Sequence, residues 1–229
     1  VRFDPLENGG MFFTEMRAGL RLAGYWTDDF FCFGNWYMRA SDQTFDEYFA
    51  SRPSALRNSI LRGRRRLNRE GVWSISMHLP ETPHLDQAIA AFNSVYAKSW
   101  KTPEPFPNFI PGLIRTAAAQ GWLRLGILCV GDIPVAAQLW LVKSGKANIY
   151  KLAYVKGCER FSVGSVLTAA MMRHVIEVDR VAEVDYLTGD DAYKRDWMSH
   201  RRERVGLIAF DPLTLTGLAA AARPHWRPD

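Results

Sequence analysis

The stretch of sequence that decides the fold runs from Asn148 to Trp197 and reads NIYKLAYVKGCERFSVGSVLTAAMMRHVIEVDRVAEVDYLTGDDAYKRDW. Its first part is apolar over residues 149–155, which predicts a strand. A loop with small residues follows and opens an amphipathic helix over residues 162–179. A second strand is predicted over residues 182–187, before a Gly-Asp-Asp turn. A strand, a crossover helix and another strand predict two parallel neighbours joined by a right-handed connection.

The loop before this helix carries Ser162, Gly164 and Ser165. A loop of small residues that opens a helix presents free backbone N–H groups and the positive end of the helix dipole, which together suit a phosphate group. Tyr193 adds an ionisable hydroxyl shortly after the second strand. A phosphate cradle beside such a hydroxyl indicates group transfer from a nucleotide-like donor.

The elements around this stretch predict an α/β (α+β) fold with a mixed central sheet. Strands over 122–130, 134–142 and 147–155 form an antiparallel meander, because Gly131-Asp132 and Ser144-Gly145 supply turns between them. Ligands of sheets with a parallel pair bind where neighbouring strands diverge, outside their carboxyl ends. The other predicted elements are strands over 20–26, 30–38, 72–77 and 205–210, and flanking helices over 44–70, 85–100, up to 120 and 190–200.

Local signals predict where several of these elements begin. Thr44 and Glu47 have the spacing of a capping box. Thr82 and Asp190 are predicted to cap the helices that follow them. A turn at Thr27-Asp28-Asp29 is predicted to part the first two strands.

The composition is that of an ordinary soluble globular protein, with 48% hydrophobic and 23% charged residues in 229. We expect no membrane span and no secretory leader, because no apolar run has the required length or setting. Cys32, Cys129 and Cys158 are far apart and odd in number, which fits a reducing cytoplasm better than a disulfide framework. HExxH, GxSxG and Walker patterns are missing, so metal-dependent, hydrolase and phosphate-hydrolysing sites are not expected.

The net charge of +5 is unevenly distributed along the chain. Basic clusters suit phosphates, nucleic acid or another anionic surface, but they also occur on solvated helix faces, and the sequence leaves both interpretations open. One cluster comprises Arg57, Arg62, Arg64, Arg65, Arg66 and Arg69, and the other comprises Arg195, Arg201, Arg202 and Arg204.

Together with this order of elements, several sequence stretches resemble the GNAT superfamily of N-acyltransferases. Within it the chain is most similar to the CelD-type acetyltransferases, a branch of bacterial proteins associated with exopolysaccharide and cellulose biosynthesis that is related to FemAB-like transferases. The resemblance implies a GNAT acyltransferase domain over 81–229, preceded over 1–80 by what remains of a first GNAT-like lobe. The matching stretches are FGNWY (33–37), ASRPSALRNSILRGRRRL (50–67), YAKSWKTPEPFPNFI (96–110), GWLRLGIL (121–128), AAQLW (136–140), IYKLAY (149–154) and DYLTGDDAYKRDWMSHRRER (185–204).

The resemblance implies acetyl-CoA or another acyl-CoA as donor. The family's pyrophosphate loop follows an Arg/Gln-x-x-Gly-x-Gly/Ala pattern, from which this chain departs with Phe161 at the Arg/Gln position and Val166 at the last small position. Backbone N–H groups can still hold the phosphates, with Arg160 or Lys156 supplying charge. The implied donor-binding residues are Leu152, Ala153, Tyr154 and Val155 for the pantetheine arm, and Arg160, Val163, Gly164, Ser165 and Lys194 for the charged end.

The resemblance also implies roles in catalysis. Tyr193 lies where GNAT enzymes often carry the tyrosine that protonates the departing thiolate. Its alternative role is that of a packed aromatic residue. Candidate bases for the acceptor are Asp185 and Glu104, alongside Asp190, Asp191 and a water relay. Trp100, Lys101 and Lys151 are expected to line the acceptor pocket, and Arg62 and Arg65 to attract an anionic group.

Three hypotheses follow from the sequence. The first is an acyl-CoA-dependent transferase that acts by direct attack of an amine or hydroxyl in a ternary complex, on a small-molecule, peptide or saccharide acceptor. The second is a FemAB-like transferase that takes its acyl group from aminoacyl-tRNA, which the basic segment favours. The third is a degenerate GNAT lobe that binds a nucleotide or a partner without catalysis.

Overall fold

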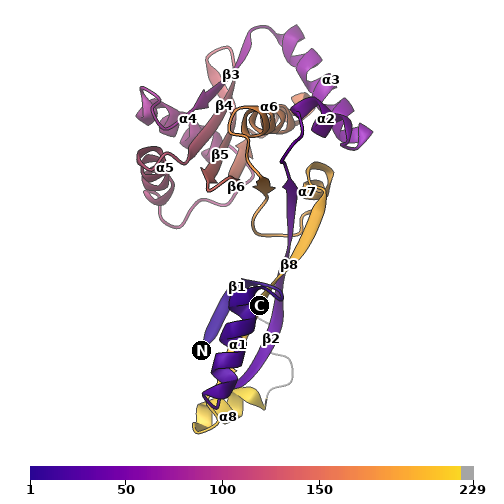
Figure 1. Ribbon diagram of the computed structural model, residues 1–229. Helices are drawn as coiled ribbons and strands as arrows, with labels where there is room; N and C mark the ends of the chain where they lie inside the picture. Colours follow the sequence, from indigo (N-terminus) through magenta and orange to yellow (C-terminus); the bar gives the residue numbers. More distant parts are fainter. Residues whose placement is uncertain (223–229) are drawn as a thin grey trace. The chain divides into compact units, whose positions relative to one another are not determined.

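The chain forms two units in the computed structural model, which describes residues 1–222 (Figure 1). The larger unit comprises Tyr37–Leu187, and the smaller unit comprises Val1–Trp36 together with the chain from Thr188 onward. The boundary expected after residue 80 runs inside the larger unit, because residues 37–80 pack with residues 81–187.

The sheet of the larger unit contains the predicted meander and the predicted parallel pair. Its strand order is β2-β7-β6-β5-β4-β3. The pairs β3–β4, β4–β5 and β5–β6 are antiparallel, whereas the pair β6–β7 is parallel. The prediction of a mixed α/β sheet is therefore confirmed. The strands are β2 (Trp26–Arg39, of which residues 37–39 belong to this unit), β3 (Trp73–His78), β4 (Leu123–Val130), β5 (Ile133–Lys143), β6 (Lys146–Tyr154) and β7 (Glu183–Asp185).

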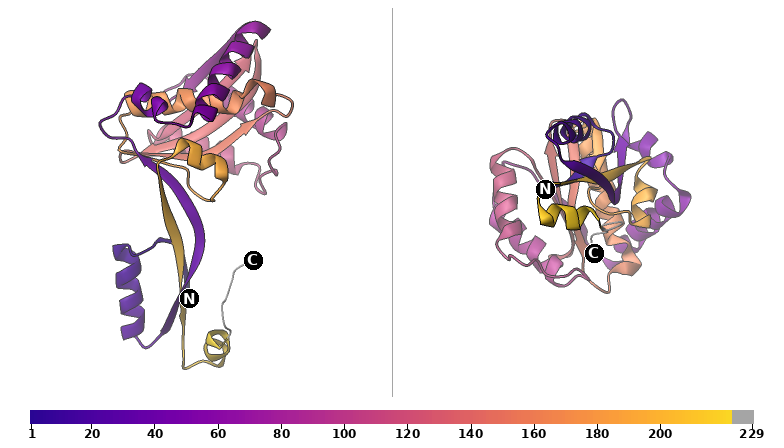
Figure 2. Two further views of the ribbon diagram at one scale, coloured as in Figure 1. Left: turned by 90° about the vertical axis from the view of Figure 1, so that its right-hand side faces the viewer. Right: turned by 90° about the horizontal axis from the view of Figure 1, so that it is seen from below.

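Helices cover both faces of this sheet (Figure 1). On one face, α4 (Leu85–Ala97) and α5 (Phe109–Ala119) bury Phe92 and Ile114 against apolar side chains of β4, β5 and β6. On the other face, α6 (Val163–Glu177) runs across β4 and β5. Gly126 of β4 makes this approach possible, because a Cβ there would lie 2.7 Å from the Met171 sulfur. Helices α2 (Phe45–Ala50) and α3 (Ser54–Glu70) pack against α6 on this side (Figure 2).

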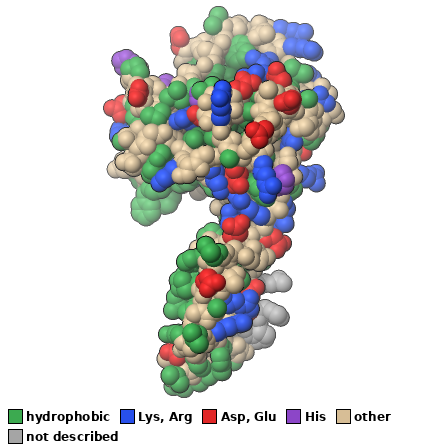
Figure 3. All heavy atoms as spheres, in the orientation of Figure 1, with side chains coloured by type: hydrophobic (Ala, Val, Ile, Leu, Met, Phe, Trp, Pro, Cys, Tyr) green, Lys and Arg blue, Asp and Glu red, His purple; other side chains and the backbone are tan. Residues whose placement is uncertain are grey.

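The smaller unit is built on the antiparallel pair β1 (Arg2–Glu7) and β8 (His200–Phe210). It also contains α1 (Met11–Leu22), the first part of β2, α7 (Ala192–Trp197) and α8 (Leu215–Ala221). Phe13 of α1 and Leu207 of β8 belong to its small core. Hydrophobic side chains are also prominent on its surface (Figure 3), among them Met11, Phe12, Leu22, Leu213 and Leu215.

The predicted strand over 20–26 and the turn after it are wrong. Residues up to Leu22 belong to α1, and β2 runs without a break through Thr27-Asp28-Asp29. The helix buries its stripe Phe13, Met16 and Leu20, whose spacing of three and four residues is helical. Strand β2 is hydrogen-bonded to β8, which favours an extended chain through the Asp pair, and an ion pair between Arg17 and Asp29, 3.2 Å long, ties β2 to the helix. Strand β1 and helix α8 were not predicted.

The capping predictions had mixed outcomes. The capping box of Thr44 and Glu47 is confirmed, with both hydrogen bonds formed. The cap at Thr82 is wrong, since its hydroxyl accepts the Leu79 N–H and helix α4 starts after His84. The cap at Asp190 is also wrong: α7 begins after Asp191, and the Asp190 carboxylate instead accepts hydrogen bonds from Arg201 and Trp36. Helix α4 ends at Ala97 rather than at residue 100.

A buried ion pair ties β4 to the chain that leaves α6. Arg124 donates to both carboxylate oxygens of Asp179 at 2.6–3.1 Å, and the two side chains are only 14% and 8% exposed. We expect Arg124→Met to lower the free energy of unfolding by about 3–5 kcal/mol, because it strands a buried carboxylate without its partner. Urea denaturation followed by circular dichroism measures the effect.

Arg115→Met is the matched control, because Arg115 pairs with Asp86 at 2.9 Å in an exposed setting. Exposed pairs contribute about 0–1 kcal/mol. Equal effects of the two substitutions would contradict the structural importance of the Arg124–Asp179 pair.

Candidate active site

The two parallel strands of the larger unit separate after the first third of β6. The ladder between β6 and β7 ends at Asn148 and Asp185, whereas β6 continues to Tyr154 with β5 as its partner. A register shift leaves Tyr150 as an extra residue in β6, and such bulges bend a strand and increase its twist. Among residues 1–222, β6 beyond Asn148 therefore has a free backbone edge on the side of β7, where ligands of such sheets bind.

Helix α6 begins immediately beyond this free edge. Ser162 precedes it in the left-handed conformation, at φ 51°, and the first helical hydrogen bond joins Val166 N–H to the Ser162 carbonyl. The N–H groups of Val163, Gly164 and Ser165 lie before that bond and have no partner within the helix. These three groups are the donors of the predicted phosphate cradle, and the prediction concerns the ligand that they bind.

Gly164 allows α6 to start close to β6. A Cβ at this position would lie 3.1 Å from Cδ1 of Tyr154, tighter than almost all such contacts. The Tyr154 ring also meets Trp100, with 4.4 Å between ring centroids. Trp100 is 46% exposed, so it borders the site rather than filling the core. Three of the predicted residues, Trp100, Tyr154 and Gly164, are thus brought together in a row.

A buried polar network fixes the first turn of α6 on β5, and the sequence analysis missed it. The Gln138 amide donates to the Gly164 carbonyl at 3.0 Å and to the Thr168 hydroxyl at 2.7 Å. The Trp140 indole N–H donates to the Gln138 carbonyl oxygen at 3.0 Å. A buried amide with its partners in place specifies one arrangement, because leaving it unpaired would be costly. The available signal was a lone glutamine in an apolar strand.

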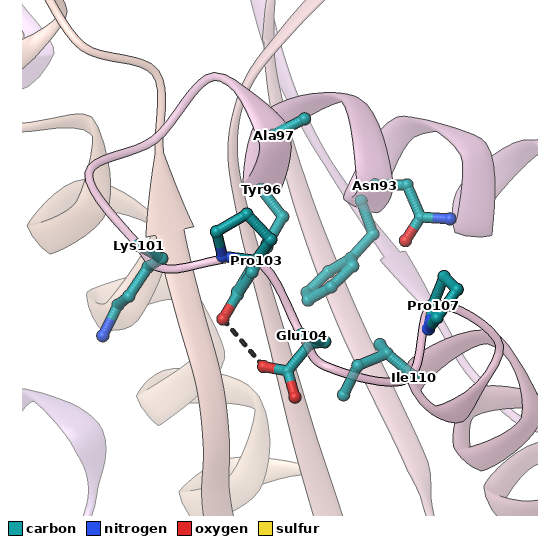
Figure 4. A pocket seen from close by; sticks show the side chains of 9 residues that line it. Asn93, Tyr96, Ala97, Lys101, Pro103, Glu104, Pro107 and Ile110 are labelled. Carbon is teal, nitrogen blue, oxygen red and sulfur yellow. Dashed lines mark hydrogen bonds between the residues drawn. The ribbon is translucent and has the colours of Figure 1, made fainter.

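Three ionisable side chains, those of Tyr96, Glu104 and Lys151, meet where the loop between α4 and α5 reaches β6. Lys151 of β6 donates to Oε1 of Glu104 at 2.5 Å, and the Tyr96 hydroxyl donates to the same oxygen at 2.8 Å. Glu104 lies in the loop between α4 and α5, which is held to the end of β6 because Lys156 N–H donates to the Lys98 carbonyl at 3.1 Å. The second oxygen of Glu104 points away from Tyr96 (Figure 4). The participation of Tyr96 was not predicted.

A pocket of about 330 Å³ opens beside Glu104 (Figure 4). Its walls are mainly apolar, and Lys101 and Glu104 are its charged members. A mainly apolar hollow with a few polar groups is typical of a small-molecule site. The lining residues are Phe92, Asn93, Tyr96, Ala97, Lys101, Pro103, Glu104, Pro107 and Ile110.

The surroundings of Glu104 hold it as a carboxylate. The hydrogen bond from Lys151, followed by that from Tyr96, keeps the pKa of the Glu104 carboxyl below its usual range in spite of partial burial. Burial, together with the bond to Glu104, raises the pKa of Tyr96 to about 12, so that the phenol stays protonated. Glu104 can therefore accept a hydrogen bond from a ligand at neutral pH, although the low pKa makes it a weak base.

The remaining candidates of the larger unit have different surroundings. Asp185 is buried at the end of β7 and accepts the Leu187 N–H at 2.7 Å. Arg160 is exposed, lies over the Phe161 ring and pairs with Glu70 at 3.3 Å. Arg62 and Arg65 are exposed on α3.

Tyr193 and Lys194 belong to α7 of the smaller unit. Burial raises the pKa of Tyr193 to about 12, with Asp191 contributing, while the side chain stays 44% exposed. The Lys194 ammonium is buried and donates to the Thr188 and Gly189 carbonyls at 2.6 and 3.2 Å, so that it braces the loop before α7.

All three cysteines are free thiols, and burial is the main cause that raises the pKa of Cys158, which makes it a poor nucleophile. Across residues 1–222, no three or more His, Cys, Asp and Glu side chains are grouped so that they could hold a metal ion. No helix in that range is both long and apolar enough to span a lipid bilayer.

The match to a family model identifies the class of protein. Residues 54–195 match the model described as an acetyltransferase (GNAT) domain. This range contains strands β6 and β7, the cradle and the Glu104 pocket. The chain belongs to the GNAT acetyltransferase family. No curated protein sequence resembles the chain at a significant level.

Solved structures agree with the fold. The chain is similar to FemX, with a TM-score of 0.65 at 11% identity over 90% of this chain and 71% of the other. It is also similar to L-PGS from Bacillus licheniformis, with a TM-score of 0.61 at 11% identity over 96% and 71%. A third is the C-terminal domain (DUF2156) of a protein designated lysylphosphatidylglycerol synthetase from Agrobacterium fabrum, with a TM-score of 0.62 at 13% identity over 90% and 66%. The chain thus spans about two thirds of these structures.

The contact between Lys151 and Glu104 leads to a prediction about ionisation. We expect Lys151→Met to raise the pKa of Glu104, because the ammonium that stabilises the carboxylate is removed. Carboxyl ¹³C NMR titration measures this, with the resonance assigned through Glu104→Gln. Lys146→Met is the matched control, since Lys146 lies on the same strand but pairs with Glu183. An unchanged Glu104 titration in Lys151→Met would show that the ion pair does not form in solution.

Proposed function

We propose that the protein transfers an acyl group from acyl-CoA to the amine of an acceptor. The observation that carries this proposal is the free edge of β6 beyond Asn148, which leads directly to the uncapped start of α6. An extended amide-bearing arm can add to a free strand edge through backbone hydrogen bonds. A diphosphate at the end of that arm suits the helix N-terminus.

In this proposal the donor lies along residues 152–155, and its pyrophosphate binds the N–H groups of Val163, Gly164 and Ser165. These donors are backbone groups, so Phe161 in place of the usual Arg or Gln does not remove them. Arg160 adds positive charge at the loop, although its pairing with Glu70 offsets part of that charge.

The acceptor is assigned to the pocket beside Glu104. Its apolar walls favour an amine carried on an apolar or aromatic group, and the Glu104 carboxylate accepts a hydrogen bond from the amine N–H. Glu104 suits this role better than Asp185, which is buried and bonded to its own loop. The acceptor nitrogen attacks the thioester carbonyl, so that the C–N bond forms and the C–S bond breaks. The proton lost by the nitrogen passes through water, because Glu104 is a weak base.

The resemblance to CelD-type proteins also bears on where the protein acts and in which process. It favours a cytoplasmic bacterial enzyme associated with polysaccharide biosynthesis, in which case a sugar amine would compete with the apolar amine that the pocket walls favour. Peptide amines and saccharide hydroxyls are the competing acceptors for the same pocket.

A second candidate function is a FemAB-like transfer from aminoacyl-tRNA. The observation that favours it is the row of exposed arginines on α3, namely Arg62, Arg64, Arg65, Arg66 and Arg69. A large positive surface is what binding to a nucleic acid backbone requires. A degenerate lobe that binds a nucleotide without turnover is the third candidate.

Isothermal titration calorimetry with CoA, and in parallel with bulk tRNA, separates these candidates. We expect saturable one-site CoA binding and, with tRNA, only weak binding that falls steeply as salt rises. Release of free thiol from acetyl-CoA in the presence of an amine panel then tests turnover. Lack of CoA binding with tight tRNA binding would overturn the proposal in favour of the second candidate, and CoA binding without turnover of any acyl-CoA would favour the third.

The proton donor to the departing thiolate is assigned to Tyr193 on the basis of the family resemblance. Its raised pKa keeps the phenol protonated at neutral pH. We expect Tyr193→Phe to lower kcat by about 10²–10⁴-fold, because a positioned general acid is lost. CoA affinity and the thermal midpoint should change little, since the ring still packs.

Tyr25→Phe is the matched control in the same unit and should leave kcat near the parent value. Steady-state kinetics measures both variants. A kcat within a few-fold of the parent for Tyr193→Phe would remove Tyr193 from the chemistry.

A further inference from the structure

One face of α3 lies directly against the loop that leads into the cradle. Ser59, Gly63 and Arg66 are spaced at four and three residues, which places them on one side of the helix. They meet, in reverse order, three consecutive residues of the loop: Ser162, Phe161 and Arg160. We call this contact the α3 clamp.

The middle contact of the clamp leaves no space for a side chain. Gly63 is buried, and a Cβ there would lie 2.4 Å from the Phe161 carbonyl oxygen. Contacts under 3.0 Å are essentially never found for real Cβ atoms, and this neighbour is backbone, which cannot swing away. A glycine in the middle of a helix costs about 0.5–1 kcal/mol relative to alanine. Here that cost is offset by the close approach to the loop.

The outer contacts hold the two ends of the loop. The Arg66 guanidinium donates to the Arg160 carbonyl at 2.5 Å, which brings one positive charge to the loop backbone. The Ser59 and Ser162 hydroxyls are 2.9 Å apart and hydrogen-bonded. All three consecutive loop residues are therefore fixed by one helix.

The backbone of Ser162 leaves the cradle uncapped. A serine before a helix usually caps it from an extended conformation by accepting N–H bonds from the first turn, which would occupy the donors a phosphate needs. Ser162 makes no such cap, because it lies in the left-handed conformation at φ 51°, and its hydroxyl is hydrogen-bonded to Ser59. The first-turn N–H groups of α6 are consequently left for a ligand.

We propose that Ser59, Gly63 and Arg66 are positioning residues that hold the loop, and with it the uncapped start of α6, in place for the donor's pyrophosphate. The proposal rests on the acyl-CoA function proposed above. It also accounts for Phe161: the side-chain cation missing from the loop is replaced by a loop held rigidly by a neighbouring helix, with Arg66 supplying charge from α3.

The effect of the clamp should be confined to the phosphate end of the donor. Gly63→Ala should weaken CoA binding about tenfold or more, as expected when a charged hydrogen bond is lost. Binding of pantetheine, which lacks the pyrophosphate, should be unchanged. Gly112→Ala is the matched control, because Gly112 is also helical but has open space around it. It should leave both affinities at the parent values.

Ser59→Ala keeps the inference testable if Gly63→Ala does not fold. It removes the hydrogen bond that holds Ser162 to α3, so we expect weaker CoA binding with a thermal midpoint close to that of the parent. Calorimetry with CoA and with pantetheine measures all variants. If the parent binds CoA and both variants bind it as tightly, or if CoA and pantetheine weaken together, the clamp has no phosphate-specific role. If the parent itself binds no CoA, the function proposed above fails instead.

Discussion

The constraint on which the site depends is the end of backbone pairing between β6 and β7 at Asn148 and Asp185. Strand β7 is only three residues long, so most of β6 lacks a partner on that side. An edge that exposes unpaired N–H and C=O groups inside a sheet is costly unless water or a ligand satisfies them. This unpaired edge belongs to the part of β6 that lies beside both the cradle and the Glu104 pocket.

Close approach between elements is achieved mainly with glycine. Gly126 lets α6 lie on β4, Gly164 lets α6 start against Tyr154, and Gly63 lets α3 reach the loop. In each case a neighbour fills the space that a side chain would need: the Met171 side chain at Gly126, the Tyr154 ring at Gly164 and the Phe161 backbone at Gly63. The Gln138 network adds direction to this packing, since its hydrogen bonds fix which turn of α6 faces β5. The cradle is thus held from two sides, by β5 and by α3.

Local patterns predicted the centre of the fold, because its strands alternate between turns and its helices have a clear stripe. They failed at the start of the chain, where α1 has a short apolar stripe and β2 passes through an Asp pair that normally turns. Glu104 and Lys151 were each singled out, but their contact spans 47 residues of sequence and depends on how the α4–α5 loop reaches β6. Ser59, Gln138 and Tyr96 lie within stretches that resemble the family, but no pattern in the sequence gave any of them a role. Their parts in the site arise only from tertiary neighbours, as does the pairing of Asp190 with Arg201 instead of a helix end.

The contact between Gly63 and the Phe161 backbone couples two positions almost a hundred residues apart, so we expect substitutions at them to depend on each other. A larger residue at position 63 forces the loop outward, and only a loop that has already changed its path can accept it. Substitutions on α3 should therefore show strong epistasis with the loop, while the exposed arginines around them drift freely. In homologues, the residue at the position of Gly63 should then indicate whether the loop before α6 follows the same path as here.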